Sequence, residues 1–246
     1  MANNKVETSP QVYARVGGMA YLFIIIAGMF GEAYVRGTMV VSGDAAATAG
    51  NIMNSPLLWR LGIAGDLLMH VCDVIVVWAV YLLLRPVNKN LALLAMLFNM
   101  IQTAVLVLNK LNLMMPLFLM GNADYLKSFD QQQLHSLAYL AIKEHGYGFG
   151  IGLIYFGFSI IIVGYLLFRS GYFPKALGVM MAIAGVCYLF NSFAMIIAPS
   201  FADLIYPIVL IPGFIGELSF CLWLIVKGVN IKVWNEHQQQ LAGPAV

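Results

Sequence analysis

The chain consists of six long apolar segments separated by short polar connections. A helix needs about 20 mostly apolar residues to cross a bilayer, and each segment is long enough to do so. We therefore expect an all-α, polytopic membrane bundle of six transmembrane helices. The expected helices cover residues 16–34, 57–84, 91–120, 137–168, 176–198 and 206–226.

The longest connection joins the first two expected helices and predicts a short interfacial helix. Ser42, Gly43 and Asp44 precede a run of alanines, which is typical of a capped helix start, and this helix should end near Asn54. It is too short and too polar to span a membrane, so it is either a lid or a simple connector. Ser55 and Pro56 then predict an N-cap and a first-turn proline for the next helix.

Composition supports a lipid environment. Hydrophobic residues make up 61% of the chain and charged residues 10%, whereas soluble domains have about 45–50% and about 25%. The net charge of +2 comes without a cluster of basic residues, so we expect no nucleic-acid partner. The three cysteines lie inside apolar runs without paired spacing, and we interpret them as small hydrophobic residues.

Positive charges predict the orientation. Basic residues are enriched on the cytoplasmic side of membrane proteins. On one side of the expected bundle lie Lys5, Arg15, Arg85, Lys89, Arg169, Lys175, Lys227 and Lys232; the other side has Arg36, Arg60 and Lys127. We predict a cytoplasmic N-terminal tail (1–15), a transmembrane domain (16–227) and a cytoplasmic C-terminal tail (228–246), located in the bacterial cytoplasmic (inner) membrane.

Small residues form stripes on the fourth and fifth expected helices. The stripes are Gly150, Gly157 and Gly164 on one helix, and Gly178, Ala182, Gly185 and Ser192 on the next. Small side chains allow helix backbones to approach closely in lipid. We expect a tight helical hairpin at this seam; a hinge or a ligand groove is the alternative.

Ionisable side chains inside the apolar segments are the most informative feature. An ionised group at the bilayer centre costs about 2.5–3.5 kcal/mol, so these groups must pair, become neutral or line a wet interior. They are concentrated towards the outer half, which predicts a polar cavity that opens outward. Its candidate ligand or ion-binding residues are Glu32, Asp66, His70, Asp73, Lys110 and Glu217.

The second expected helix carries Asp66, His70 and Asp73 at positions i, i+4 and i+7, which places them on one face. Such a stripe could bind a divalent metal, with His145 and Glu217 as further ligands, relay protons or hold an organic cation. It could also be a buried network that fixes helix register. No HExxH or GxSxG motif supports an enzyme class.

Two further segments carry basic residues, and the first of them has two interpretations. Lys110 could neutralise an inward carboxylate or extend outward to the interface. Lys143, Glu144 and His145 form a polar triplet that we expect to be interfacial and solvated.

Several motifs together resemble one family. They include Arg15-Val16-Gly17-Gly18, Gly31-Glu32, Gly43-Asp44-Ala45-Ala46-Ala47-Thr48-Ala49, Arg60-Leu61-Gly62, Cys72-Asp73, Leu84-Arg85-Pro86-Val87-Asn88, Arg169-Ser170-Gly171 and Gly216-Glu217-Leu218. The chain resembles, over about residues 12–229, the bacterial membrane proteins of domain-of-unknown-function family 4386. The resemblance implies a multi-helix inner-membrane protein and supplies no activity, cofactor or catalytic residue.

Three functional hypotheses remain. The first is a membrane protein that binds a small molecule, lipid or ion in the outward-facing cavity. The second is an intramembrane metal-dependent hydrolase with a metal on Asp66, His70 and Asp73 and with Glu217 or Glu144 as general base. The third is a structural membrane protein without a ligand. Beyond the lipid bilayer, the sequence predicts neither a partner nor an oligomeric state.

Overall fold

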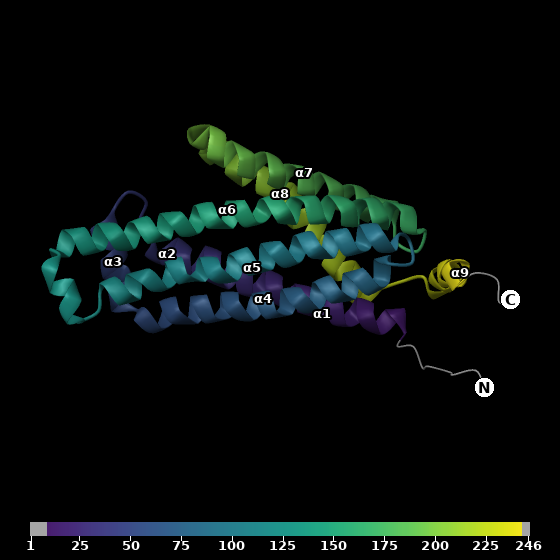
Figure 1. The fold of residues 1–246 in the computed structure, drawn as a ribbon, viewed down its shortest axis with the longest axis horizontal. Coiled ribbons are helices and arrows are strands. Elements are labelled where there is room, and N and C mark those ends of the chain that lie inside the picture. Colours follow the sequence, from purple (N-terminus) through teal and green to yellow (C-terminus); the bar gives the residue numbers. More distant parts are fainter. Residues whose placement is uncertain (1–8, 243–246) are drawn as a thin grey trace.

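The computed structural model describes residues 9–242, and every regular element in that range is a helix (Figure 1). Within residues 9–242, six helices are long and apolar enough to cross a membrane, so the protein is a multi-pass membrane protein. The elements are α1 (Pro10–Met29), a π-helical segment (Phe30–Arg36), α2 (Gly37–Met39), α3 (Ala45–Asn54), α4 (Pro56–Leu84), α5 (Lys89–Leu119), a 3₁₀ turn (Asp124–Ser128), α6 (Gln131–Ser170), α7 (Lys175–Ile197), α8 (Pro199–Val226) and α9 (Ile231–Ala242).

Several helices extend beyond the apolar segments that predicted them. The clearest case is α6, which begins at Gln131 rather than at residue 137. The Asp130 carboxylate accepts from the Gln133 backbone N–H at 2.8 Å, and the Gln133 side chain accepts from the Asp130 N–H at 3.1 Å. This capping box starts a helix in polar sequence. With 40 residues, α6 is about 60 Å long and extends beyond a bilayer.

The predicted short helix between the first two spans is present as α3. Asp44 caps it, because the Asp44 carboxylate accepts from the Ala47 N–H at 2.8 Å. α3 packs against α5 and α6. The predicted cap of α4 is only partly right: Ser55 makes no side-chain capping bond, and Pro56 alone marks the first turn.

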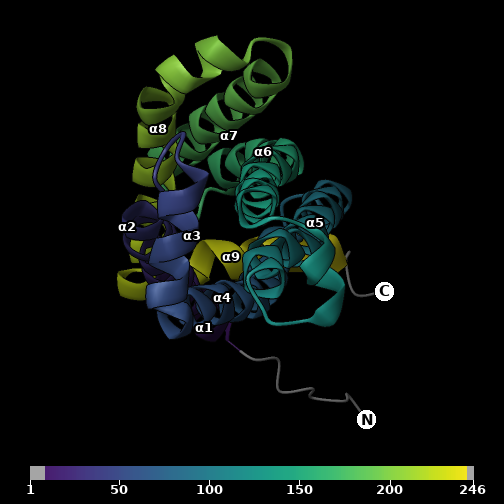
Figure 2. The same ribbon diagram turned by 90° about the vertical axis from the view of Figure 1, so that its left-hand side faces the viewer.

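The six long helices form a closed ring in chain order. Each helix packs against the next one along the chain, and α1 packs against both α4 and α8. Figure 2 views the bundle from the end that carries α3 and shows the α7–α8 hairpin on one side of it. A ring of this kind leaves room along its axis.

The α6–α7 seam confirms the predicted hairpin. A Cβ added to Gly164 would lie 2.6 Å from the carbonyl oxygen of Gly178, and one added to Gly185 would lie 2.7 Å from that of Gly157. Real Cβ atoms do not approach so closely. The two backbones are therefore in contact along the stripe of small residues.

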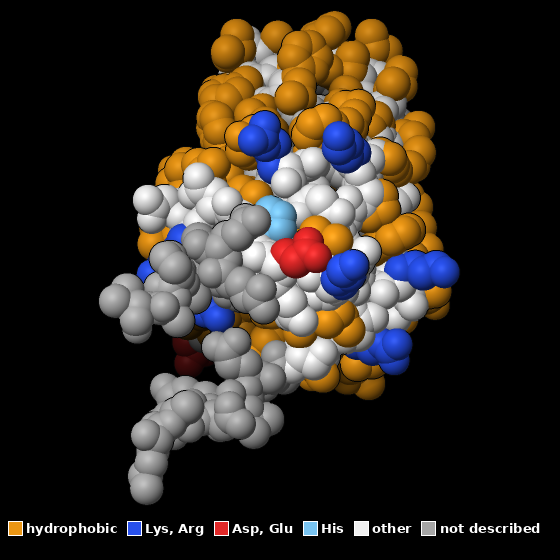
Figure 3. All heavy atoms as spheres, turned by 90° about the vertical axis from the view of Figure 1, so that its right-hand side faces the viewer, with side chains coloured by type: hydrophobic (Ala, Val, Ile, Leu, Met, Phe, Trp, Pro, Cys, Tyr) orange, Lys and Arg blue, Asp and Glu red, His pale blue; other side chains and the backbone are white. Residues whose placement is uncertain are grey.

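The opposite end of the bundle, where α1 begins, is held by polar contacts between segments far apart in the sequence. The Gln11 side chain donates to the Lys227 carbonyl at 2.8 Å and accepts from the Val229 N–H at 3.0 Å. The Tyr172 hydroxyl donates to the Leu83 carbonyl at 2.6 Å. Burial raises the pKa of the Tyr172 phenol, so it stays a neutral donor. Figure 3 shows Lys and Arg side chains gathered around this end.

Candidate functional site

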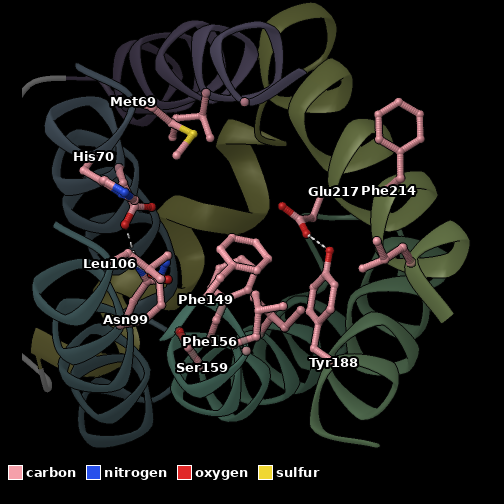
Figure 4. Close-up of a pocket in the computed structure, with 18 of the residues that line it drawn as sticks. Met69, His70, Asn99, Leu106, Phe149, Phe156, Ser159, Tyr188, Phe214 and Glu217 are labelled. Carbon is pink, nitrogen blue, oxygen red and sulfur yellow. Dashed lines mark hydrogen bonds between the residues drawn. The ribbon is translucent and has the colours of Figure 1, made fainter. Parts of the chain in front are cut away.

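A cavity of about 770 Å³ lies inside the helix ring. All six long helices contribute to its wall, and Figure 4 shows side chains from them converging on it. Its size falls within the range of small-molecule sites, about 300–1,000 Å³.

The cavity opens at one end of the ring and is closed at the other. Glu32, Tyr147 and Asp203 line it towards the end of the bundle that carries α3 and are exposed, whereas Leu84 and Leu166 line it at the α1-start end and are buried. The lining residues of α4 run from Asp66 to Leu84. At about 1.5 Å per residue, this stretch is about 27 Å deep.

An ion-pair network lies at the open end. The Asp66 carboxylate is fully buried and lies 2.8 Å from the Arg36 guanidinium and 2.9 Å from Lys110 Nζ. Arg36 also contacts Glu32 at 2.6 Å, although the Glu32 side chain is 67% exposed. The buried Lys110 and the half-buried Arg36 therefore share one buried anion.

The π-helical segment positions part of this network. It carries both Glu32 and Arg36, and π-helical turns inside α-helices are frequent at functional sites. A Cβ at Gly31 would collide with the Asp66 carboxylate. Glycine at this position lets α4 bring Asp66 against the π-helical turn.

Two histidines complete the open end. His145 Nε2 lies 3.2 Å from Lys110 Nζ, and Asn109 donates to the His145 carbonyl at 2.8 Å. His70 is only 3% exposed, yet its Nε2 has no hydrogen-bond partner in the described part of the chain. Because buried polar atoms are nearly always paired, this unpaired nitrogen on the cavity wall requires an explanation.

Further into the cavity, two carboxyl groups are held by neutral donors. Asp73 accepts from Asn99 at 2.9 Å and from the Thr103 hydroxyl. These contacts tie α4 to α5, and none of them involves a cation.

Glu217 on α8 is the second of these inner carboxyl groups. It accepts from the Tyr21 hydroxyl at 2.8 Å and from the Tyr188 hydroxyl. Figure 4 shows Glu217 and the Tyr188 hydroxyl joined by this bond on one side of the cavity. Each Glu217 oxygen is thus matched by one phenol donor, and the bonds link α8 to α1 and α7.

All six residues of the predicted cavity set line this one space: Glu32, Asp66, His70, Asp73, Lys110 and Glu217. Lys110 pairs with an inward carboxylate, as one of its two interpretations proposed. The expectation that His145 is solvated is wrong, because only Lys143 and Glu144 of that triplet are exposed and His145 is buried.

The predicted metal set is not assembled. Among residues 9–242, the structure brings together no group of three or more His, Cys, Asp or Glu side chains that could hold a metal ion. The reason lies in the ion pairs, because Arg36 and Lys110 occupy the carboxylate oxygens of Asp66. Asp66, His70 and Asp73 lie on one face of α4, as their spacing predicted. However, Asp66 and Asp73 each bind different side chains on other helices, so the three residues do not form one ligand set.

Four residues were not identified from the sequence as part of the site: Arg36, Tyr21 and Tyr188, which line the cavity, and Thr103, which donates to Asp73. Arg36 lies at the end of an apolar segment, where basic residues are common, and its spacing of four from Glu32 was the one available signal. Tyrosine and threonine in apolar helices carry no comparable signal, since most of them are structural.

Comparison with known proteins places the chain without assigning it an activity. An archaeal protein from Archaeoglobus fulgidus, described as an uncharacterized protein, is 30% identical over 167 residues, which is 68% of this chain and 83% of that protein. No solved structure matches the chain. The family model of a domain of unknown function, DUF4386, matches residues 16–228, and the chain therefore belongs to the DUF4386 family.

Proposed function

We propose that this membrane protein binds an amphipathic small molecule, such as a lipid, in the cavity of the helix ring. The observation that carries the proposal is one cavity of about 770 Å³ with an ionic open end and a mostly apolar closed end. Such a space suits a ligand with a polar head and an apolar body, because each part finds a matching wall.

The gradient of polarity runs along the cavity. Arg36, Asp66 and Lys110 line the open end, and Asp73 and Glu217 lie further in. Beyond them the wall is mostly apolar, although Tyr81 and Ser159 also line it. Its apolar side chains include those of Val76, Val77, Val80, Leu84, Leu153, Phe156, Ile160, Val163, Leu166, Met181 and Phe220. Burying an acyl chain there is favourable at about 0.8 kcal/mol per CH₂ group.

We also propose in which membrane the protein lies and which end of the bundle faces the cytoplasm. The end where α1 begins faces the cytoplasm, with residues 1–15 and 228–246 as cytoplasmic flanks of the six-helix domain 16–227. The exposed basic residues Arg15, Lys89, Arg169, Lys175, Lys227 and Lys232 support this orientation. We place the protein in the bacterial cytoplasmic (inner) membrane. In this orientation the cavity opens to the outer side of that membrane.

A mouth-blocking variant tests ligand binding. Gly146 lines the cavity, is exposed and would place an added Cβ in open space. Gly146→Trp therefore fills the mouth without a backbone clash. Gly50→Trp is the matched control, because Gly50 lies on α3, is also exposed and unobstructed, and does not line the cavity.

The measurement is native mass spectrometry of the purified proteins titrated with monolauroylglycerol, a neutral amphiphile. We expect a saturable bound species in the wild type and in Gly50→Trp, and a loss of at least about tenfold in affinity in Gly146→Trp, equivalent to about 1.4 kcal/mol. Equal binding by all three proteins, or by none, would overturn the proposal.

A second candidate, a structural membrane protein without a ligand, is favoured by the dense pairing around Asp66. It predicts that no amphiphile binds saturably to any of the three proteins. The hydrolase hypothesis has no such support, since its metal set is not assembled in the described part of the chain.

A further inference from the structure

We infer that the open end of the cavity is a subsite for an anionic head group, a phosphate or a carboxylate. This inference rests on the proposed function and specifies the chemistry of its ligand. Its residues are Arg36, Lys110 and His70, which line the same cavity from the π-helical segment, α5 and α4.

Charge is the first argument. The side chains of Arg36 and Lys110 are 10% and 5% exposed, and the Asp66 side chain between them is 0% exposed. Glu32 also pairs with Arg36, but its side chain is 67% exposed, so solvent screens that pair and a ligand can replace it. The buried part of the network therefore carries two positive charges for one negative charge.

Hydrogen-bonding capacity is the second argument. A guanidinium has five N–H donors and an ammonium has three. Arg36 uses its donors on Glu32 and Asp66, and Lys110 uses its donors on Asp66 and His145. Three of the five Arg36 donors and two of the three Lys110 donors are thereby used, so both cations, which line the cavity, have donor capacity left. An oxyanion supplies several acceptor lone pairs, so it satisfies such donors better than a neutral head group does.

His70 is the third and independent argument. Its side chain lies one helical turn from Asp66, is 97% buried and projects from α4 towards the cavity in Figure 4. Nε2 has no partner among the residues that the structure describes. An unsatisfied buried nitrogen is destabilising, and a ligand oxygen would offset this cost by accepting a hydrogen bond from Nε2 in the tautomer or charge state that carries a hydrogen there.

The inner carboxyl groups set the direction of the ligand. Asp73 and Glu217 have only neutral hydrogen-bond donors: Asn99 and Thr103 for Asp73, and Tyr21 and Tyr188 for Glu217. An anion placed beside these carboxyl groups gains no cation. It is held instead at the open end, and the apolar part of the molecule points inward.

The depth of the cationic cluster in the membrane agrees with a lipid head group as the source of the anion. Asp66 lies about 27 Å from Leu84 along α4. Arg85 follows Leu84 and marks the membrane boundary on the side opposite to the cavity mouth. The hydrocarbon core of a bilayer is about 30 Å thick. The cationic cluster therefore lies at the level where the head groups of one leaflet begin.

The experiment compares probes that share one alkyl chain. Wild-type protein in a neutral detergent is titrated by native mass spectrometry with dodecyl phosphate, monolauroylglycerol, dodecyltrimethylammonium and inorganic phosphate. We expect dodecyl phosphate to bind at least about tenfold more tightly than the neutral probe, and we expect the cationic probe to bind more weakly still.

Variants of two subsite residues test whether the preference for dodecyl phosphate arises at the proposed subsite. His70→Leu should lower the affinity for dodecyl phosphate about fivefold, and Lys110→Met about tenfold or more, while the affinity for monolauroylglycerol stays within about twofold. His70 makes no hydrogen bond through Nε2, so its replacement should leave folding intact. Lys127→Gln is the control, because Lys127 is 77% exposed, pairs with Asp124 and lies outside the cavity.

The outcomes separate the two proposals. Equal affinity for the phosphate and the neutral amphiphile would overturn the anionic subsite and leave the amphiphile-binding function standing. Equal affinity for inorganic phosphate and dodecyl phosphate would keep the anion site and overturn the amphipathic ligand. If neither dodecyl phosphate nor monolauroylglycerol binds saturably, both proposals fail.

Discussion

Lys110 on α5 reaches Asp66 on α4 across the open end of the cavity, with 2.9 Å between Nζ and the carboxylate oxygen. Both side chains are almost completely removed from solvent. Breaking one partner of a buried pair is strongly destabilising, because the other charge stays buried without compensation.

We therefore predict that Asp66→Asn lowers the free energy of unfolding by about 3 kcal/mol or more. Two cations, Arg36 and Lys110, would lose their shared counterion. The check is unfolding of the purified protein in a denaturing-detergent titration. In the double variant Asp66→Asn/Lys110→Met, part of the lost stability should return; a strictly additive effect would contradict the pairing.

The α6–α7 seam gives a prediction about packing. Gly164→Ala places a Cβ 2.6 Å from the Gly178 carbonyl oxygen, which forces the two backbones apart and should cost about 1–3 kcal/mol. Gly146→Ala is the control, because its Cβ meets open space, and it should be neutral or stabilising by up to about 1 kcal/mol. Thermal unfolding of both variants tests this, and equal melting temperatures would refute the seam.

The Glu217 cluster gives a prediction about hydrogen bonding. Tyr188→Phe removes one phenol donor from the partly buried Glu217 carboxyl, and we expect a loss of about 1–3 kcal/mol. Tyr165→Phe is the control, because Tyr165 is 50% exposed and lies outside the cavity. Adding Glu217→Gln to Tyr188→Phe should cost less than the sum of the two single changes. Chemical unfolding of the four proteins measures the coupling, and its absence would count against the bond.

The proposed orientation gives a prediction about labelling in cells. In a background with Cys72, Cys187 and Cys221 replaced by alanine, Lys127→Cys should react with a membrane-impermeant maleimide in intact cells. Lys175→Cys should react only after permeabilisation, because it lies at the basic end of the bundle. Both positions are exposed in the structure. The reverse labelling pattern would show that the cavity opens to the cytoplasm.

The sequence alone was enough to predict the six spans, the short helix after the first span and the α6–α7 seam. Each of these follows from local physics: the length of an apolar run, a capping residue before alanines, and small residues repeated on one helix face. Ionised groups cannot face lipid, so the inward position of Asp66, Asp73 and Glu217 was also predictable as a group. Helix ends were less predictable, because α6 begins in polar sequence where hydrophobicity gives no signal.

Only the tertiary structure decided which partner each polar group takes. Asp66 pairs with Arg36 and Lys110, although its spacing from His70 and Asp73 had favoured a shared metal site. The π-helical turn that brings Arg36 to Asp66 leaves no mark in the hydrophobic pattern, and neither do the tyrosines that bind Glu217. The physical reason is range: spacing along one helix determines which side chains share a face, whereas contacts across the cavity depend on how six helices close into a ring.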